Sequence, residues 1–489
     1  MTEPNRPDVI IVGGGYTGAA AAIHLSRLAK RPLSITVIEP RAQLGRGIAY
    51  DTVDPTHRLN INPEIMILYL DDIDHFPRYV RATGVLGDDP AAKVSDGMVY
   101  PRRAIFGDYM VDEVAAHQVN NPSRSTIHHL RDRAVALAET AGGLRLTTAE
   151  GRVLEAGRVL LCPSHGRPSI PGGLDPDLAD DPRYIADPWD SDAIGRIQPD
   201  ARTLILGTGL TAGDVLSSLR HRGHRGSTVM LSRHGISPQQ QFDLGDVNAL
   251  LARISRPVPI FIERHGWHAG FRDIVKAVRA DIAETRAEDP DADWRPQFDH
   301  IRDAGRAIWR RLPDAEKRRY VRHLKTYYDA HRNRVAPQVM AVVDAGLADG
   351  SVTLVAGRIV CCTMGMASID ITYRPRRGGA EHTRPFDAVV NCTGPAHRPN
   401  LVGNPVVDSA IGHGLARADP FGFGLEVDGL GRALGHDGTA QNRLFVAGPL
   451  TRGQFGDIIA VAQITVQLQT VLPALLGATS SLVSDKPPA

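Results

Sequence analysis

The stretch DVIIVGGGYTG at residues 8–18 joins a short apolar run, a glycine turn and the start of an apolar helix. A second stretch, TLILGTGLTAG at residues 203–213, repeats the same order of features. An apolar run that ends in closely spaced glycines before a helix is typical of the first strand, turn and helix of a nucleotide-binding βαβ unit. Two such units in one chain predict that two dinucleotides bind to the same protein.

In the first turn, Gly13, Gly15 and Gly18 fit the spacing G-x-G-x-x-G. The first glycine allows the tight turn, the second lets a pyrophosphate approach the backbone, and the third lets the helix pack on the strand. The next expected strand, residues 34–38, ends at Glu39, whose carboxylate can bind the hydroxyls of an adenosine ribose and would repel a 2′-phosphate. The first site is therefore predicted to hold FAD or NAD. The expected contacts are Gly13, Gly15, Thr17, Gly18, Glu39 and Arg41.

The second turn is looser, because Gly207, Gly209 and Gly213 give the spacing G-x-G-x-x-x-G. Arg233 takes the place, at the same offset from the first glycine, that Glu39 has in the first unit. A guanidinium forms paired, charge-assisted hydrogen bonds with phosphate. We therefore predict FAD at the first site and NADPH at the second, with NADH as the weaker alternative and a solvated surface role for Arg233 left open. The expected contacts are Gly207, Thr208, Gly209, Thr211, Ser232 and Arg233.

The composition narrows the class of protein. The chain has 489 residues, of which 42% are hydrophobic and 23% are charged, and its formal net charge is +1. This length predicts two or three domains, and the balanced charge gives no sign of nucleic-acid binding. The sequence shows no secretory leader and no apolar tract typical of a membrane span, so we expect a cytoplasmic protein.

The spacing of the cysteines and histidines argues against two classes of site, a redox dithiol and a metal centre. The four cysteines form no Cys-x-x-Cys pair, which argues against the exchanging dithiol of a flavin disulfide reductase. The histidines lack the spacing of a metal site, so no metal is expected. Since the sequence shows no arrangement of nucleophile, histidine and acid, we assign no catalytic residue.

The order of strands and helices predicts an α/β protein with two dinucleotide-binding, Rossmann-like domains. The FAD-binding domain is expected to be discontinuous, at residues 1–170 and 386–489, and the NAD(P)H-binding domain to cover 183–238 and 344–385. The polar stretch 239–343 has helical periodicity and is predicted to be a helical insertion in the second domain. Its expected helices cover residues 247–254, 271–283, 301–312 and 320–330.

Five further motifs carry a family resemblance: GRGIAY (45–50), HRLNI (57–61), HRNRVAP (331–337), NCTGP (391–395) and GPLTRG (448–453). With the two turns, the chain resembles the bacterial FAD/NAD(P)-binding proteins that lie near the lysine and ornithine N-hydroxylases and the Baeyer–Villiger-type flavin monooxygenases. The resemblance implies a monooxygenase that consumes NAD(P)H and molecular oxygen. In such enzymes reduced FAD forms a C4a-hydroperoxide, which transfers one oxygen atom to a small substrate.

The resemblance leaves the substrate open. The expected substrate is a small N-heterocycle. The resemblance favours urate, which would be converted to 5-hydroxyisourate in purine metabolism. One alternative is N-hydroxylation of an amine or amino acid, and another is a non-catalytic flavin-binding sensor. The intact second glycine turn argues against the sensor, which would not need it.

The resemblance also implies roles for particular residues. Asn60 is expected near the flavin, and Asp457 near its polar end. An anionic substrate such as urate requires cations in its pocket, whereas Trp294 and Trp309 are expected to pack in the core. The candidate substrate-binding cations are Arg58, Arg103 and Arg332, beside Arg102 and Arg334.

Overall fold

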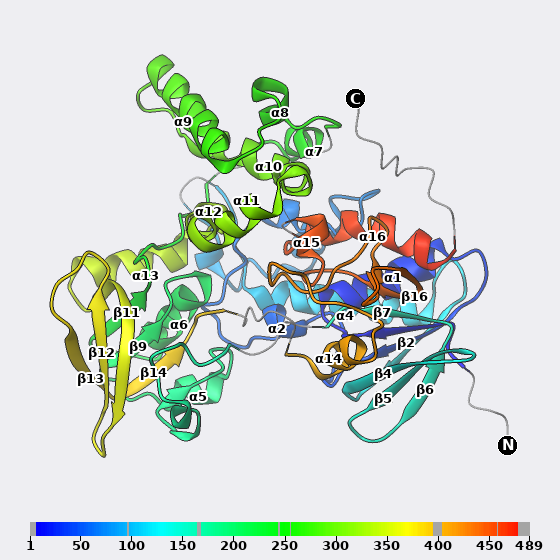
Figure 1. Ribbon diagram of the computed structural model, residues 1–489, viewed down its shortest axis with the longest axis horizontal. Coiled ribbons are helices and arrows are strands. Elements are labelled where there is room, and N and C mark those ends of the chain that lie inside the picture. The colour runs from blue at the N-terminus through cyan, green and yellow to red at the C-terminus, as the bar shows by residue number, and fades with distance from the viewer. Residues whose placement is uncertain are drawn as a thin grey trace.

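The computed structural model describes residues 6–94, 97–163, 168–242, 245–254, 256–394, 403–456 and 458–477. Two lobes, each built on a largely parallel sheet, lie side by side, and a helical lobe stands above them in the view of Figure 1. The predicted fold class is confirmed: an α/β protein with two Rossmann-like domains.

The first sheet is centred on β1 (Val9–Val12), whose four side chains are all buried. A strand buried on both faces is expected to be continuously apolar, as this one is. The strand order is β15-β16-β7-β1-β2-β3, and only β15 runs antiparallel to its neighbour. The bounds are β2 (Ser34–Ile38), β3 (Thr126–Leu130), β7 (Arg158–Leu161), β15 (Arg432–Leu434) and β16 (Ala440–Val446).

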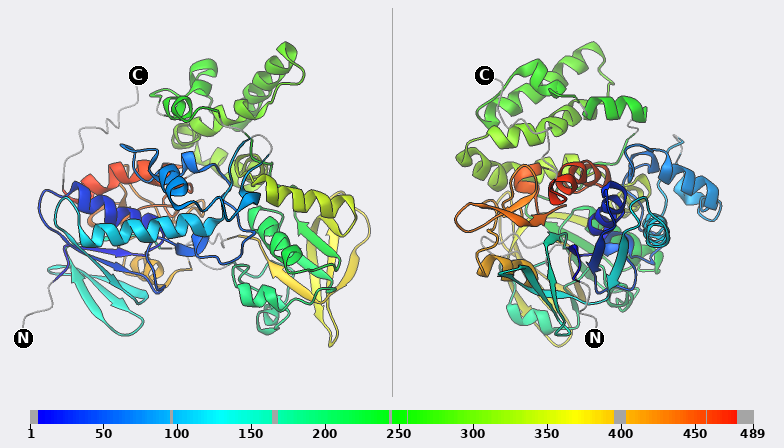
Figure 2. Two further views of the ribbon diagram at one scale, coloured as in Figure 1. Left: turned by 180° about the vertical axis from the view of Figure 1, so that it is seen from behind. Right: turned by 90° about the vertical axis from the view of Figure 1, so that its right-hand side faces the viewer.

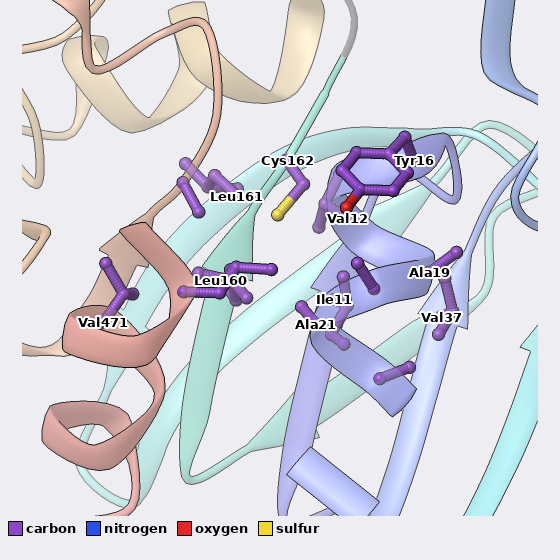
Figure 3. Packing of buried hydrophobic residues seen from close by; sticks show 14 of the residues in the cluster. Ile11, Val12, Tyr16, Ala19, Ala21, Val37, Leu160, Leu161, Cys162 and Val471 are labelled. Carbon is purple, nitrogen blue, oxygen red and sulfur yellow. The ribbon is translucent and has the colours of Figure 1, made fainter. Parts of the chain in front are cut away.

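Helices cover one face of this sheet, and a small antiparallel sheet covers the other (Figures 1 and 2). The helices are α1 (Tyr16–Leu28), α4 (Arg103–Val119) and α16 (Val461–Leu475), and the small sheet is β4 (Ala134–Thr140), β5 (Gly143–Thr148) and β6 (Val153–Ala156). The run of alanines at 19–22 in α1 is completely buried, because small side chains let this helix lie close to the strands. Figure 3 shows α1 and α16 packed over Ile11 and Leu160.

The second sheet has the order β13-β12-β11-β10-β9-β14-β8. Its parallel part is β8 (Tyr184–Ile185), β9 (Thr203–Leu206), β10 (Thr228–Ser232), β11 (Val352–Met364) and β14 (Ala388–Asn391). The antiparallel strands β12 (Ile369–Pro375) and β13 (His382–Phe386) extend it at one edge. Helices α6 (Leu210–His221) and α13 (Pro337–Ala348) pack together beside its parallel strands.

One predicted domain boundary is wrong. Residues from 386 onward were expected to return to the first domain, but β14 pairs with β9 and β8 in the second sheet. The run Ala388–Asn391 is fully buried and apolar, so its sequence fits either sheet. The chain therefore rejoins the first lobe only after β14.

The helical lobe contains the elements predicted for the insertion. Its helices are α7 (Val247–Ile254), α8 (Ile260–His265), α9 (Phe271–Glu288), α10 (Arg295–Arg311), α11 (Asp314–Arg319), the π-helical turn η4 (Tyr320–Leu324) and α12 (Lys325–Arg332). The predicted end of the insertion at residue 343 falls inside α13, which packs against α6 of the second lobe. The helical lobe thus ends before α13.

The remaining described elements are short connections between these layers. They are α2 (Gly47–Tyr50), α3 (His75–Thr83), α5 (Ser191–Gly195), α14 (Pro405–Gly412), α15 (Arg452–Phe455) and the 3-10 turns η1 (Pro63–Ile65), η2 (Pro90–Ala92) and η3 (Pro176–Asp180). Among the described residues, none of the helices combines the length and the apolar character that crossing a bilayer requires.

A buried ion pair joins the two nucleotide-binding lobes. Arg103, the first residue of α4, contacts both carboxylate oxygens of Asp214 in α6, at 2.8 and 3.1 Å. The two side chains are only 8% and 3% exposed. Beside them, His57 hydrogen-bonds Ser218 of α6 at 3.0 Å, and burial lowers the pKa of this histidine, which keeps it neutral at pH 7. The junction between the lobes is therefore polar, buried and internally paired.

Replacing Asp214 by alanine should lower the free energy of unfolding by about 3–5 kcal/mol, because Arg103 would stay buried without its partner. Urea unfolding measures this loss. Glu155→Ala is the matched control, since it removes an ion pair with Arg145 whose side chains are 38% and 53% exposed. The control should lose less than about 1 kcal/mol. Equal losses in the two variants would show that the buried pair between the lobes contributes no more to the free energy of unfolding than an exposed pair does.

Candidate functional site

The two glycine turns share one geometry. Gly13 and Gly207 both have a positive φ, +96° and +106°. A Cβ at Gly13 would lie 2.4 Å from the carbonyl oxygen of Cys162, and a Cβ at Gly207 would lie 2.5 Å from that of Cys392. These cysteines directly follow β7 and β14, the strands beside β1 and β9. Only glycine fits both the backbone angle and the space, so each turn is held against the end of its neighbouring strand.

The same cysteines are structural. Cys162 and Cys392 are buried, and burial raises the pKa of both thiols, so neither is a thiolate at pH 7. All four cysteines are free, and the adjacent Cys361 and Cys362 lie in β11. No cluster of metal-binding side chains occurs among the described residues.

Each turn leads into a helix whose N-terminus lacks a side-chain cap. Gly15 is the N-cap of α1 and Gly209 that of α6, no side chain bonds to either first turn, and neither turn contains an acidic residue. The first backbone N–H groups of a helix need acceptors and carry a partial positive charge. A Cβ at Gly209 would meet no atom within 4 Å, which leaves room beside this helix end. The residues present therefore fit the phosphates of a dinucleotide at both sites.

Glu39 lies directly after β2 and is held against the first turn. Its Oε2 accepts a hydrogen bond from the N–H of Gly14 at 2.9 Å, and its Oε1 accepts from the N–H and the guanidinium of Arg41 at 3.1 and 3.2 Å. Arg41 also reaches Asp51 at 3.5 Å. The acid thus lies against the first glycine turn, and its contact with a ribose stays a prediction.

Arg233 directly follows β10 and is exposed, and its side chain makes no hydrogen bond or ion pair with the described part of the chain. A second guanidinium lies beside it, because Arg376 donates to the carbonyl oxygen of Arg233 at 3.3 Å and to His234 at 2.5 Å. Burial, followed by the charges of Arg376 and Arg233, lowers the pKa of His234, so the ring is neutral at pH 7. The strand end therefore presents two cations side by side. The sequence analysis missed Arg376, which follows β12 and is distant in sequence.

Three threonines among the other predicted cofactor residues lie in or beside the two turns. Thr208 donates to Ser232 at 3.0 Å and so links the second turn to the end of β10. Thr17 is buried in the first turn of α1, and Thr211 is half-buried in the first turn of α6. Asn60 accepts a hydrogen bond from the N–H of Ala336 at 3.2 Å. Asp457 lies outside the described residues. Their roles toward a cofactor stay predictions.

The predicted substrate cations separate into two groups. Arg58 forms a buried ion pair with Asp89, and Arg103 is occupied by Asp214. The geometry argues against a substrate role for both, because their charges are already balanced inside the protein. Arg334, two residues after Arg332 in the sequence, is likewise buried and paired with Asp299, at 2.7 Å.

Arg332, by contrast, lies where the helical lobe meets the first lobe. It donates to Asn333 at 2.8 Å and to Gln463 of α16 at 3.3 Å. Arg332 therefore remains a candidate for substrate binding.

A cavity of about 460 Å³ lies between the helical lobe and the first lobe. Helices α9, α10 and α12 form most of its wall, and the first lobe contributes Phe423, Arg452, Gly456 and Ile459. Trp309 crosses this boundary by donating to the carbonyl oxygen of Gly453 at 2.9 Å. Trp294 and Trp309, which were expected to pack in the core or between helices, both line this cavity, and Trp309 is buried as expected. A larger hollow, about 830 Å³, lies at the amino ends of β1 and β7, opposite the glycine turns.

The family match agrees with the geometry of the first turn. Residues 10–166 match the protein family described as FAD-NAD(P)-binding. No curated protein matches the chain. The match confirms the predicted cofactor class, FAD with a nicotinamide dinucleotide.

Solved structures extend the likeness to the whole chain. An ornithine N-hydroxylase from Kutzneria sp. 744, with reduced FAD, NADP+ and L-ornithine, is 13% identical and has a TM-score of 0.61, with 96% of this chain and 99% of that chain covered. The L-lysine 6-monooxygenase from Pseudomonas syringae is 15% identical, with a TM-score of 0.62 and 97% and 100% coverage.

A third structure is the FAD-bound cadaverine monooxygenase from Erwinia amylovora, which is 12% identical. It has a TM-score of 0.64, and 99% of each chain is covered. At identities this low, the three likenesses establish the fold.

Replacing Gly209 by alanine should weaken nicotinamide dinucleotide binding and leave the fold intact, because the added methyl meets only the space kept for the pyrophosphate. We expect the KM for NADPH in flavin reduction to rise about tenfold, the equivalent of about 1.4 kcal/mol. Gly207→Ala is the contrasting variant, and its strained turn should lower the melting temperature. A Gly209→Ala protein with unchanged KM would contradict this placement of the cofactor.

Proposed function

We propose that the protein is an FAD-dependent, NAD(P)H-consuming monooxygenase that transfers one oxygen atom to a nitrogen atom of a small molecule. The observation that carries this proposal is the pair of matched glycine turns, each leading into an uncapped helix at the carboxyl edge of its own sheet. Such a pair suits two dinucleotides, one of which reduces the other. The whole-chain likeness to three monooxygenases, two of them solved with FAD, supports the same arrangement.

The chain's own residues would bind and orient the cofactors. At the first site, the N-terminus of α1 would hold the pyrophosphate of FAD and Glu39 its ribose, and Asn60 would contact the flavin. When bound, FAD accepts a hydride from NAD(P)H and then activates molecular oxygen. The buried pair of Arg103 and Asp214 keeps the two sites in fixed relation. The helical lobe covers the cavity and helps to keep water from the reaction.

NADPH is the nicotinamide cofactor that the second site favours. Arg233 and Arg376 place two guanidinium groups at the end of β10, where the first unit has the carboxylate of Glu39. A 2′-phosphate can accept bidentate hydrogen bonds from such groups, whereas the free hydroxyls of NADH cannot use the charge.

Arg233→Ala should raise the KM for NADPH about ten- to a hundredfold, because one charge-assisted phosphate contact contributes about 1.5–3 kcal/mol. The KM for NADH should change little. Steady-state oxidation of each nucleotide by the purified yellow protein measures both values. Arg145→Ala is the matched control, since this arginine is exposed and lies in β5, distant from the second sheet. Unchanged constants for both nucleotides would remove the proposed phosphate contact.

Oxygen transfer to nitrogen is favoured over hydroxylation of urate. The names of the similar structures describe monooxygenases of ornithine, lysine and cadaverine, and none of these three is a purine hydroxylase. Urate hydroxylation to 5-hydroxyisourate remains the second candidate, because it would need the same two cofactors.

Product mass separates the candidates. The purified protein is incubated with NADPH and oxygen across a panel of amines, amino acids, purines and aromatic acids. An amine that gains one oxygen as a hydroxylamine supports the leading proposal, and 5-hydroxyisourate from urate supports the second. A non-catalytic flavin-binding sensor predicts that neither NADPH nor NADH bleaches the bound flavin in stopped flow, whatever ligand is present.

A further inference from the structure

The cavity between the helical lobe and the first lobe has the size of a small-molecule site. Its volume is about 460 Å³, whereas close-packed protein interiors keep few voids larger than a water molecule. It reaches Gly456 and Ile459, on the segment that leads into α16 of the first lobe. Tyr320 and Leu324 of the π-helical turn η4 also line it. Such turns occur frequently at functional sites, so size, place and backbone together indicate a ligand site.

The wall of this cavity is mostly apolar. Of the 27 residues that line it, nine are aliphatic and eight are aromatic, so an apolar ligand would be in contact with carbon on most sides. Five of the aromatic rings form a continuous series: Phe423 to Trp309 at 5.4 Å, Trp309 to Tyr320 at 5.7 Å, Tyr320 to Tyr328 at 5.9 Å, and Tyr328 to Phe298 at 5.5 Å. Centroid distances of this size are typical of favourable aromatic pairs. A flat ring would extend this series.

Two of the charged side chains in the wall have partners of opposite charge within the protein. Arg302 lies 3.5 Å from a carboxylate oxygen of Asp299 and 3.7 Å from one of Asp303. Lys325 is bonded to Asp329, which is the one carboxylate among the described lining residues. These cations and carboxylates therefore balance each other without a ligand.

The other cations of the wall are also engaged. Arg279 and Arg306 are exposed, so water and salt screen their charges. The guanidinium of Arg306 lies 4.7 Å from the ring centre of Phe455, and that of Arg452 lies 5.5 Å from the ring centre of Phe423. Each charged group of the described wall is thus paired, placed over a ring or exposed to solvent.

This arrangement disfavours a charged ligand of either sign. An ion that leaves water loses its hydration and needs a counter-charge in the site to compensate. An anion or a cation would have to displace one partner of an interaction that the wall already makes. Aromatic faces attract cations, but Lys317 already lies 5.7 Å from the ring centre of Trp309 and Arg452 lies over Phe423, so a ligand cation there would meet like charge. An uncharged ring avoids both costs.

We infer that this cavity binds an uncharged aromatic amine, and not a charged aliphatic amine or an aromatic acid. The inference rests on the proposed function, because it names the substrate class of that reaction. The nitrogen of an aromatic amine is unprotonated at pH 7, whereas an aliphatic amine carries a proton. Its lone pair can accept oxygen without first losing a proton, which suits a chain in which we assign no acid–base residue.

The reaction balances with the cofactors already proposed. The amine, molecular oxygen, NADPH and one proton give a hydroxylamine, water and NADP+. An N–O bond forms and the O–O bond breaks, and the two electrons from NADPH reduce the second oxygen atom to water.

A charge series of small aromatic ligands tests the inference on the FAD-loaded full chain without NADPH. At pH 7, 4-methylaniline is uncharged, its isomer benzylamine is a cation, and 4-aminobenzoate is an anion. Calorimetric titration measures the affinity for each, with cadaverine and L-ornithine as aliphatic probes. We expect 4-methylaniline to bind at least about tenfold more tightly than any charged probe, the equivalent of about one unit in log Kd.

A change of pH gives a second measurement on the unaltered protein. Benzylamine stays mostly protonated between pH 7 and pH 8, so its uncharged fraction and its apparent affinity should rise together by about tenfold. The affinity for 4-methylaniline should stay constant, because its charge does not change. This second ligand also reports any titration of the wall itself, which contains His331.

Gly305 offers a way to fill the cavity without disturbing the fold. It lies on α10, and a Cβ there would meet as its nearest neighbour the hydroxyl oxygen of Tyr328, at 3.6 Å, which is an ordinary contact. We expect Gly305→Leu to weaken the binding of 4-methylaniline at least about tenfold. Gly412→Leu is the matched control and should leave it unchanged, since Gly412 is exposed at the end of α14 and its Cβ would meet nothing within 4 Å.

The inference is overturned if a charged probe binds more tightly than 4-methylaniline, or if no probe binds. It is also overturned if the affinity for benzylamine does not rise with pH relative to that for 4-methylaniline, or if Gly305→Leu binds 4-methylaniline as the unaltered protein does. Failure of the proposed function looks different. Protein that binds 4-methylaniline but, with NADPH and oxygen, adds oxygen to no amine would refute the monooxygenase and leave the ligand class of the cavity in place.

Discussion

The close approach of each glycine turn to the end of a neighbouring strand is the constraint on which the rest of the structure depends. At Gly13 and Gly207 the backbone must take a positive φ and pass within contact distance of a cysteine carbonyl. This contact directs each following helix so that its N-terminus lies at the carboxyl edge of the sheet. A side chain at either position would force the turn away from the strand, and the helix end would move with it.

The polar junction between the lobes adds a second constraint. Arg103 bonds to Asp214 and, through its Nε, to the carbonyl oxygen of Arg58 at 2.7 Å. A buried ion pair of this kind contributes little net stability compared with apolar packing. Removing one partner nevertheless destabilises the protein strongly, because the other charge stays buried and unpaired. The junction therefore specifies one relative placement of the two nucleotide units, which electron transfer between two bound cofactors requires.

The helical lobe has a different physical character from the two sheets. Its helices bury an apolar cluster around Phe261 and Ile308, and part of that cluster also lines the cavity toward the first lobe. Because the cavity wall comes from two parts of the chain, its shape depends on their docking. Trp309 and Arg332 make the hydrogen bonds that hold this docking in place.

The sequence by itself determined the features that depend on residues close together in the chain. The two turns, Glu39 after its strand and the helices of the insertion were predictable, because glycine spacing and helical periodicity act over a few residues. Tertiary structure alone decided the rest. A buried apolar strand such as Ala388–Asn391 fits either sheet until pairing selects one. Arg58 and Arg103 could serve a substrate until the fold places carboxylates beside them. The aromatic cavity forms only where α9, α10 and α12 meet the first lobe, since contacts between residues distant in sequence leave no local pattern.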